Sequence, residues 1–212
     1  MTVKDLPILH NADSRGLHRD ADTEDGVSAY VNNIAKQRQA AVLMPLVKTA
    51  NQWHLLFIRR ATNEDDRHSG QVAFPGGATE EGDTSATATA LRETTEEIGV
   101  TPDRIKVIAE LGHYYTISHY RVTPVVGIMQ WPSNLNLETS EVARAFLIPL
   151  SWLNNPDNYT LRARSDMDTQ SALRHPIIVY NEFDGETLWG ATARMTMNFF
   201  KAMDDNELLL PA

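Results

Sequence analysis

The chain has 212 residues and a formal net charge of −9, with 42% hydrophobic and 22% charged residues. This composition fits one globular domain with additions, and the acidic balance argues against binding to nucleic acid or an anionic membrane through bulk charge. The absence of cysteine from the sequence excludes disulfides, thiolate nucleophiles and zinc–thiolate sites. An anionic substrate remains compatible with the net charge, because a bound metal ion can supply local positive charge.

The first residues lack the features of a secretory leader. The stretch MTVKDLPILHNADSRG has no basic start followed by an apolar segment, and no apolar run in the chain approaches bilayer length. We therefore expect a cytoplasmic protein without a membrane partner. Residues 1–36 are polar and acid-rich, and we expect them to form an N-terminal arm, helical or irregular, ahead of a single domain at residues 37–212.

Short apolar runs punctuated by Pro and Gly predict the strands. Residues 40–47 and 53–60 are separated by a short polar stretch, which predicts a strand pair joined by a turn. Residues 72–77 predict a short strand running into a Pro-Gly-Gly turn. The remaining strand-like runs, of which the last two predict a hairpin, are residues 104–112, 120–129, 144–153, 175–183 and 186–190.

Two segments predict helices. Residues 84–98 are rich in alanine and end before Gly99, the residue type that most often follows a helix. Asp83 stands where an N-cap is expected. Residues 190–203 predict an amphipathic helix near the C-terminus. Strands with one helix among them and one after them predict a mixed α/β arrangement of layers.

The first of these helices carries clustered carboxylates. At about 100° per residue, Glu93, Glu96 and Glu97 share one side, while Leu91 and Ile98 fall opposite. Like charges at this spacing destabilise a helix, and acids near its C-terminus oppose the macrodipole. A hard cation such as Mg²⁺ or Mn²⁺ would reverse that cost. Taken alone, such a helix pattern is more often a solvated acidic face than a metal site.

The segment FPGGATEEGDTSATATALRETTEEIGV, residues 74–100, resembles the Nudix box, the loop–helix signature of Nudix hydrolases. The second half of the pattern is filled in register by Arg92, Glu93, Glu96, Glu97, Gly99 and Val100. The first half departs from it, because Asp83 replaces the usual glutamate and one extra residue precedes Arg92. Thr94 also stands where an apolar residue is usual.

A second resemblance lies just upstream. HSGQVAFPGG, residues 68–77, is similar to the motif that precedes the Nudix box in the coenzyme A pyrophosphatase branch of the family. Arg60 fits the arginine of that motif, and the loop after it is one residue longer than in the pattern. Three neighbouring residues depart from it: Phe57, Ile58 and Ala61. The likeness covers roughly residues 38–200.

The resemblance implies both a fold and a reaction. The implied fold is α/β (α+β), with a Nudix-type mixed β-sheet sandwiched between helices. The implied activity is that of a pyrophosphohydrolase that cleaves a diphosphate linkage with Mg²⁺ or Mn²⁺. Coenzyme A or its thioesters are the expected substrates, giving 3′,5′-ADP and 4′-phosphopantetheine or its acyl form. Two alternatives are a Nudix pyrophosphatase for ADP-ribose, NADH or nucleoside triphosphates, and a nucleotide-sensing module without catalysis. The expected partner is a small-molecule nucleotide, and a homodimer is compatible with the sequence.

The resemblance also implies roles for individual residues. We expect Glu93 and Glu97 to be the primary metal ligands, the Gly77 carbonyl to be an additional ligand, and Glu96 to be a further ligand or to help activate water. Arg92 is expected to orient the glutamates by ion pairing. Glu141 is a candidate general base or extra ligand from outside the box. The candidates for substrate binding are Arg60, His68, Gln71, Gly76 and Gly77.

Overall fold

The computed structural model of the chain describes residues 8–9, 37–62, 69–116, 119–131, 134–163 and 176–211. The expected N-terminal arm lies outside these residues except for β1 (Ile8–Leu9), whose backbone pairs with β10 (Tyr159–Arg162). Within the described part of the chain, no helix is long and apolar enough to cross a membrane.

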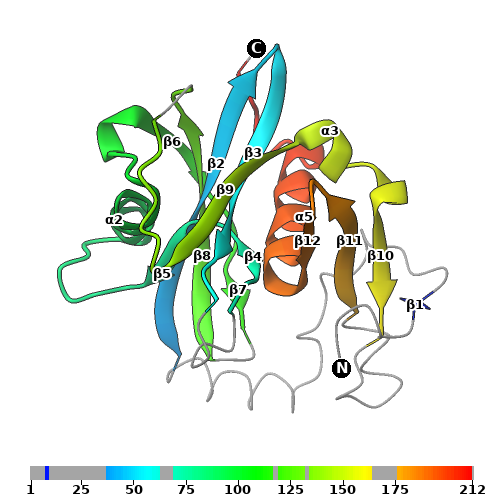
Figure 1. The fold of residues 1–212 in the computed structure, drawn as a ribbon, viewed down its shortest axis with the longest axis horizontal. Coiled ribbons are helices and arrows are strands. Elements are labelled where there is room, and N and C mark those ends of the chain that lie inside the picture. Colours follow the sequence, from blue (N-terminus) through cyan, green and yellow to red (C-terminus); the bar gives the residue numbers. More distant parts are fainter. Residues whose placement is uncertain are drawn as a thin grey trace.

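A large mixed sheet forms the centre of the fold (Figure 1). Its strands are β2 (Arg38–Thr49), β3 (Gln52–Arg60), β4 (Val72–Ala73), β5 (Gly76–Ala78), β6 (Ile105–Glu110), β7 (Tyr114–Tyr115), β8 (Tyr120–Met129) and β9 (Val142–Pro149). The order is β4-β3-β2-β8-β6, with β5 on β2, β7 on β8 and β9 on β3. β2 and β8 run parallel, and the other pairings among the described residues are antiparallel.

Helices cover both faces of this sheet. Figure 1 shows α2 (Ala86–Ile98) on one side and α5 (Gly190–Asp204) on the other. A smaller sheet of order β1-β10-β11-β12 lies on the α5 side, where β11 (Ile177–Phe183) and β12 (Glu186–Trp189) form the expected hairpin. Three short helices complete the described chain: η3 (Pro102–Arg104), α3 (Leu150–Leu153) and η4 (Pro156–Asn158). The predicted sheet between helices is confirmed.

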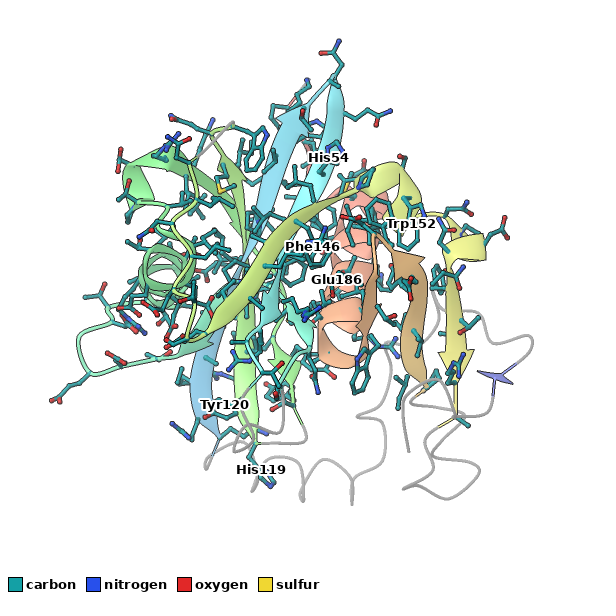
Figure 2. All side chains as sticks on the ribbon, in the orientation of Figure 1. His54, His119, Tyr120, Phe146, Trp152 and Glu186 are labelled. Carbon is teal, nitrogen blue, oxygen red and sulfur yellow. The ribbon has the colours of Figure 1, made fainter. Side chains whose placement is uncertain are left out.

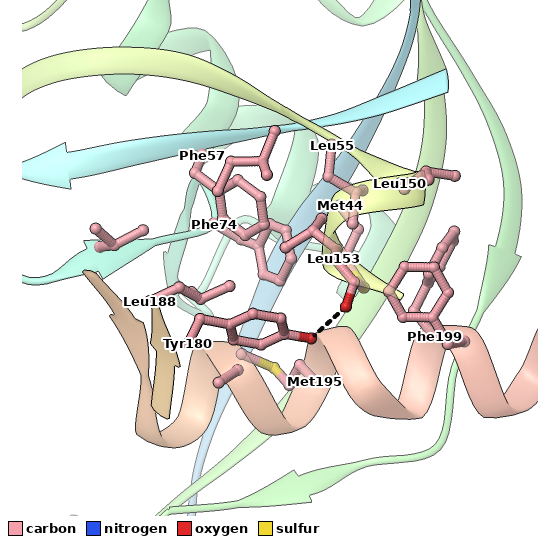
Figure 3. Close-up of a cluster of buried hydrophobic side chains, with 14 of the residues drawn as sticks. Met44, Leu55, Phe57, Phe74, Leu150, Leu153, Tyr180, Leu188, Met195 and Phe199 are labelled. Carbon is pink, nitrogen blue, oxygen red and sulfur yellow. Dashed lines mark hydrogen bonds between the residues drawn. The ribbon is translucent and has the colours of Figure 1, made fainter. Parts of the chain in front are cut away.

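Because both faces of the large sheet are covered, the sequences of its strands are unbroken apolar runs. In β3, Leu55 and Phe57 belong to the core beneath α5, whereas Leu56 and Ile58 belong to the core beneath α2. Successive side chains of a strand point to opposite faces, so a sheet covered on both faces needs apolar residues at every position. Figure 3 shows the core on the α5 side, where the Tyr180 hydroxyl donates to the Leu153 carbonyl over 3.0 Å.

The boundaries of several predicted elements differ from the structure. The glycines of the predicted Pro-Gly-Gly turn belong to strand β5, and the bend is at Pro75 alone. The run at residues 144–153 is a strand as far as Pro149, and α3 begins at the next residue. The helix predicted from residue 84 begins at Ala86 and is capped by Ser85, whose hydroxyl accepts the Ala88 N–H over 3.0 Å. Its predicted end is confirmed, since Gly99 adopts the left-handed conformation with φ of 72°.

Candidate active site

Two glycines at the start of β5, Gly76 and Gly77, bring its backbone against α2. The Gly76 N–H donates to Oε2 of Glu97 over 2.9 Å. A Cβ atom on Gly76 would lie 2.4 Å from the Ala41 carbonyl oxygen, and one on Gly77 would lie 2.5 Å from the carboxyl group of Glu93. Both contacts are shorter than real Cβ atoms allow. Gly76 is therefore needed where β5 lies against β2, and Gly77 is needed where β5 approaches the Glu93 carboxyl group.

Arg92 connects the loop before α2 to the acidic residues on the helix. Its Nε donates to Oδ1 of Asp83 over 3.1 Å, and its Nη2 lies 3.0 Å from Oδ2. Further contacts of the guanidinium reach Glu93 at 3.0 Å, Glu96 at 2.8 Å and the Ala78 carbonyl at 3.0 Å. The expected ion pairs between Arg92 and the glutamates are present, and they fix where two of these carboxylates lie.

The prediction that Asp83 caps α2 is wrong. Its carboxylate is 6% exposed and accepts hydrogen bonds from the Glu80 N–H, the Thr89 hydroxyl and Arg92, while Ser85 caps the helix. The hydrogen bond from Arg92 is the main reason why the pKa of Asp83 lies well below its ordinary value. Asp83 therefore fixes the position of Arg92 by ion pairing, and Ser85 is the residue that caps α2. Sequence reasoning missed the supporting Thr89, a buried residue within a run of Thr and Ala that carries no separate signal.

The buried side of α2 includes Ile98, as predicted, but it extends further toward the acidic side than expected. Ala90 and Thr94, about 160° and 200° from Arg92 at 100° per residue, are fully buried. Glu97 lies next to these two residues and is 1% exposed, so the expectation that the acidic side lies opposite the buried side is wrong. Small side chains let the helix approach the sheet closely. The Thr94 hydroxyl donates to the Ala90 carbonyl over 2.6 Å, which satisfies a polar residue where an apolar one is usual.

Burial makes it harder for the Glu97 carboxyl group to lose its proton. It raises the pKa of Glu97 to about 8, although the Gly76 N–H opposes the shift, and the carboxylate of Glu93 adds to it. Arg60 lowers the pKa of Glu97, whereas Glu141 raises it. The pKa of Glu93 is also raised, first by burial and in part by Glu141, while Arg92 opposes the shift. Two helix carboxylates, Glu141 and one arginine therefore lie within electrostatic reach of one another.

A bulge in β9 determines which way the chain faces beside Glu141. Arg59 pairs with Arg144 and Arg60 pairs with Val142, so Ala143 has no partner on β3. Regular alternation from Arg144 would place Val142 on the α5 side, yet Val142 is buried in the core beneath α2. The extra residue thus returns the chain to the α2 side. The Ala61 N–H then donates to the Glu141 carbonyl over 2.7 Å, which joins the ends of the two strands.

The donor chemistry of this group fits a hard divalent cation. Glu93 and Glu97 supply carboxylate oxygens, the ligands that such ions prefer, and their pKa values are raised first by burial and then by repulsion from neighbouring carboxylates. Because Gly77 has no side chain, its backbone can lie close to the Glu93 carboxyl group. Glu96 points to Arg92 and is 57% exposed. Across the described residues, no three His, Cys, Asp or Glu side chains already have the arrangement that holds a metal ion.

The remaining predicted residues lie around this group or outside the described chain. The Gln71 carbonyl accepts the Arg60 N–H over 3.0 Å, which places β4 beside the end of β3. His68 lies outside the described residues. Glu80 and Glu81 of the acidic loop are exposed.

Comparison with known proteins gives consistent matches. The model of the NUDIX domain matches residues 37–166. The uncharacterized Nudix hydrolase NudL of Citrobacter koseri is 39% identical over 155 residues, which cover 72% of this chain and 71% of the relative. The protein of the same name from Pectobacterium atrosepticum is 32% identical over 160 residues, which cover 76% and 80%.

Two solved structures share the fold. The Nudix hydrolase RenU of M. smegmatis aligns with a TM-score of 0.53 and 13% identity, covering 82% of this chain and 91% of that protein. A MutT/nudix family protein of Enterococcus faecalis aligns with a TM-score of 0.52 and 15% identity, covering 92% and 75%. At these identities the two alignments support the architecture alone.

Proposed function

The chain belongs to the Nudix hydrolase family, and we propose that Glu93 and Glu97 hold the divalent metal ion with which it cleaves a diphosphate linkage. The family makes the chain a pyrophosphohydrolase of diphosphate-bearing substrates, and Nudix hydrolases in general use divalent metal ions. The observation that carries the metal proposal is the approach of Gly76 and Gly77 of β5 to the two carboxylates. We propose Mg²⁺ or Mn²⁺ as the ion, because the donors are hard oxygens.

The proposed ligands are held from two sides. The Gly76 N–H orients the Glu97 carboxylate, and Arg92 orients Glu93 through its contact at 3.0 Å. The Gly77 carbonyl is the proposed backbone ligand, and Glu96 is a further ligand or an aid to water activation. When bound, a divalent ion neutralises phosphate oxygens and lowers the pKa of water.

Glu141 and Arg60 have separate roles in the proposed reaction. Glu141 accepts the proton of the attacking water, since it lies within electrostatic reach of both proposed ligands but stands outside α2, in the turn before β9. Arg60 offers a guanidinium that can pair with phosphate oxygens. Gln71, Gly76 and His68 are proposed to contact substrate from the segment ahead of α2. Catalysis of phosphoryl transfer rests mostly on positioning and electrostatics, so a metal ion and these side chains are sufficient for the proposed reaction.

Coenzyme A or its thioesters are the substrates we propose. The support is the resemblance of residues 68–77 to the motif of the coenzyme A pyrophosphatase branch. Two of the nearby departures from that motif, Phe57 and Ile58, are fully buried in the cores on opposite faces of the sheet. Side chains in these cores have no route to a substrate, so their identity does not weaken the assignment.

A substrate panel tests this proposal. Coenzyme A with Mg²⁺ or Mn²⁺ should give 3′,5′-ADP and 4′-phosphopantetheine, faster than ADP-ribose, NADH or nucleoside triphosphates are cleaved. Faster turnover of one of the other compounds would reject coenzyme A and keep the reaction type. Tight binding of a nucleotide without turnover of any compound would favour a sensing module.

A further inference from the structure

A second charged cluster lies on the face of the large sheet opposite α2. Glu186, the first residue of β12, has a side chain that is only 7% exposed and lies 3.6 Å from Arg59 and 3.4 Å from Arg144. Both arginines are partly exposed. A buried carboxylate is costly unless it is paired, so Glu186 depends on these two partners.

The two arginines are direct neighbours across β3 and β9. Arg59 pairs with Arg144 in the register, and Arg144 lies 5.2 Å from the ring of Phe146, a residue of the α5-side core. Figure 2 shows Glu186 beside Phe146, where the β11–β12 hairpin meets the large sheet. Like charges directly opposite each other destabilise a strand pair. Glu186 compensates that repulsion and holds the two strands together at this point.

This point is the bulge that precedes the proposed active site. The next cross-strand pair consists of Arg60 on β3 and Val142 on β9. Both residues face the α2 side, Arg60 by regular alternation and Val142 because Ala143 is unpaired. The Glu141 carbonyl is hydrogen-bonded to the Ala61 N–H over 2.7 Å. The Arg59–Arg144 pair is therefore the last regular cross-strand pair before Glu141, and Glu186 contacts it from the α5 side of the sheet.

We propose that Glu186 is a positioning residue of this hydrolase, which holds the Arg59–Arg144 pair and the adjacent bulge so that Glu141 points toward Glu93 and Glu97. This inference rests on the proposed function, in which Glu141 acts as the base. Glu186 acts from the opposite face and through the backbone of two strands. Its effect should therefore appear in the step that uses Glu141.

The same hairpin supplies a matched control. Asp184 lies in the turn before Glu186, where its carbonyl accepts Nη1 of Arg144 over 2.9 Å and its carboxylate forms an ion pair with the same arginine. The Asp184 side chain is 62% exposed, and exposed ion pairs contribute little. Asp184 has φ of 51°, a conformation that Asn tolerates well. Asp184→Asn removes a carboxylate from Arg144 without touching Glu186.

A double-mutant cycle with full-length protein tests the inference. Glu186→Gln should lower kcat by roughly 10-fold, while Asp184→Asn stays near the wild-type value. In a Glu141→Gln background, Glu186→Gln should cause no further loss, because the residue it positions is already disabled. Circular dichroism and thermal unfolding establish that each variant is folded. If Glu186→Gln does not fold, Arg59→Gln breaks the same cluster at an exposed side chain and should show the same non-additivity.

Three results would overturn the inference while leaving the proposed function intact. These are an unchanged kcat in a folded Glu186 or Arg59 variant, losses that multiply with that of Glu141→Gln, and an equal loss in Asp184→Asn. Absence of diphosphate hydrolysis by the wild-type chain would instead reject the proposed function itself.

Discussion

Asp83 and Arg92 form a two-pronged ion pair, with Nε 3.1 Å from Oδ1 and Nη2 3.0 Å from Oδ2. Such bidentate pairs fix the plane of the guanidinium as well as its position. The same guanidinium contacts Glu93 and Glu96. A loop carboxylate nine residues before Arg92 therefore helps to set where the helix carboxylates lie.

Asp83→Asn tests this relationship. The variant keeps the shape of the side chain but removes the charge that holds Arg92, so we expect the free energy of unfolding to fall by roughly 2 kcal/mol and kcat by roughly 10-fold. Urea denaturation and steady-state kinetics measure the two effects. Glu80→Gln is the control, because Glu80 is 69% exposed and lies 4.0 Å from Arg92. Equal effects in the two variants would show that Asp83 is no special anchor.

Gly77→Ala tests the close approach of β5 to α2. The new methyl group would meet the Glu93 carboxyl group at 2.5 Å, and Glu93 would have to move away. A displacement of about 1 Å at a catalytic group can lower the rate by about 100-fold, and we expect a loss of that order in kcat. Gly82→Ala is the matched control, since no atom of the described chain beyond its two sequence neighbours lies within 4 Å of the added methyl group. A fully active Gly77→Ala protein would remove Gly77 and its carbonyl from the site.

The stability of the metal-free protein should depend on pH through Glu97. Its pKa is about 8 in the folded state against an ordinary value of 4.5, so the folded state binds more protons between these values. Stability therefore falls as pH rises through this window, by roughly 2–4 kcal/mol between about pH 5 and pH 8. Thermal unfolding in the presence of a chelator measures the slope.

Glu97→Gln should flatten that slope, because the amide does not titrate. Glu96→Gln should leave it unchanged, since Glu96 is largely exposed. Mg²⁺ or Mn²⁺ should stabilise the wild-type protein more at pH 8 than at pH 5, because carboxylates must lose their protons to bind a metal. Stability that does not change with pH in metal-free protein would contradict the burial of an ionisable Glu97.

Much of the fold could be predicted because it depends on patterns within short stretches of the sequence. The strand pair around residues 50–51, the hairpin of β11 and β12 and the end of α2 at Gly99 each follow from apolar runs and turn residues in short windows. The N-cap could not be predicted this way, since both Asp83 and Ser85 can cap a helix. Arg92, seven residues beyond Ser85, decides between them by pairing with Asp83.

The phase of α2 and the bulge in β9 depend on distant parts of the chain. Leu91 and Ile98 predicted the buried side of α2, and Ile98 is fully buried, but Ala90, Thr94 and Glu97 are buried as well. A backbone N–H from Gly76 compensates the burial of Glu97. The bulge at Ala143 arises from the register against β3. A single sequence carries no signal for that register.

The central claim is that the two glycines of β5 and the acidic helix α2 form a metal-dependent diphosphatase site. The most direct measurement is the release of 3′,5′-ADP from coenzyme A, followed by mass spectrometry for the wild type and Glu97→Gln, with Mg²⁺ or Mn²⁺ and with a chelator. We predict release by the wild type with metal, loss of release with the chelator, and loss in a Glu97→Gln protein that remains folded. Equal release by wild type and Glu97→Gln in the presence of metal would contradict the account.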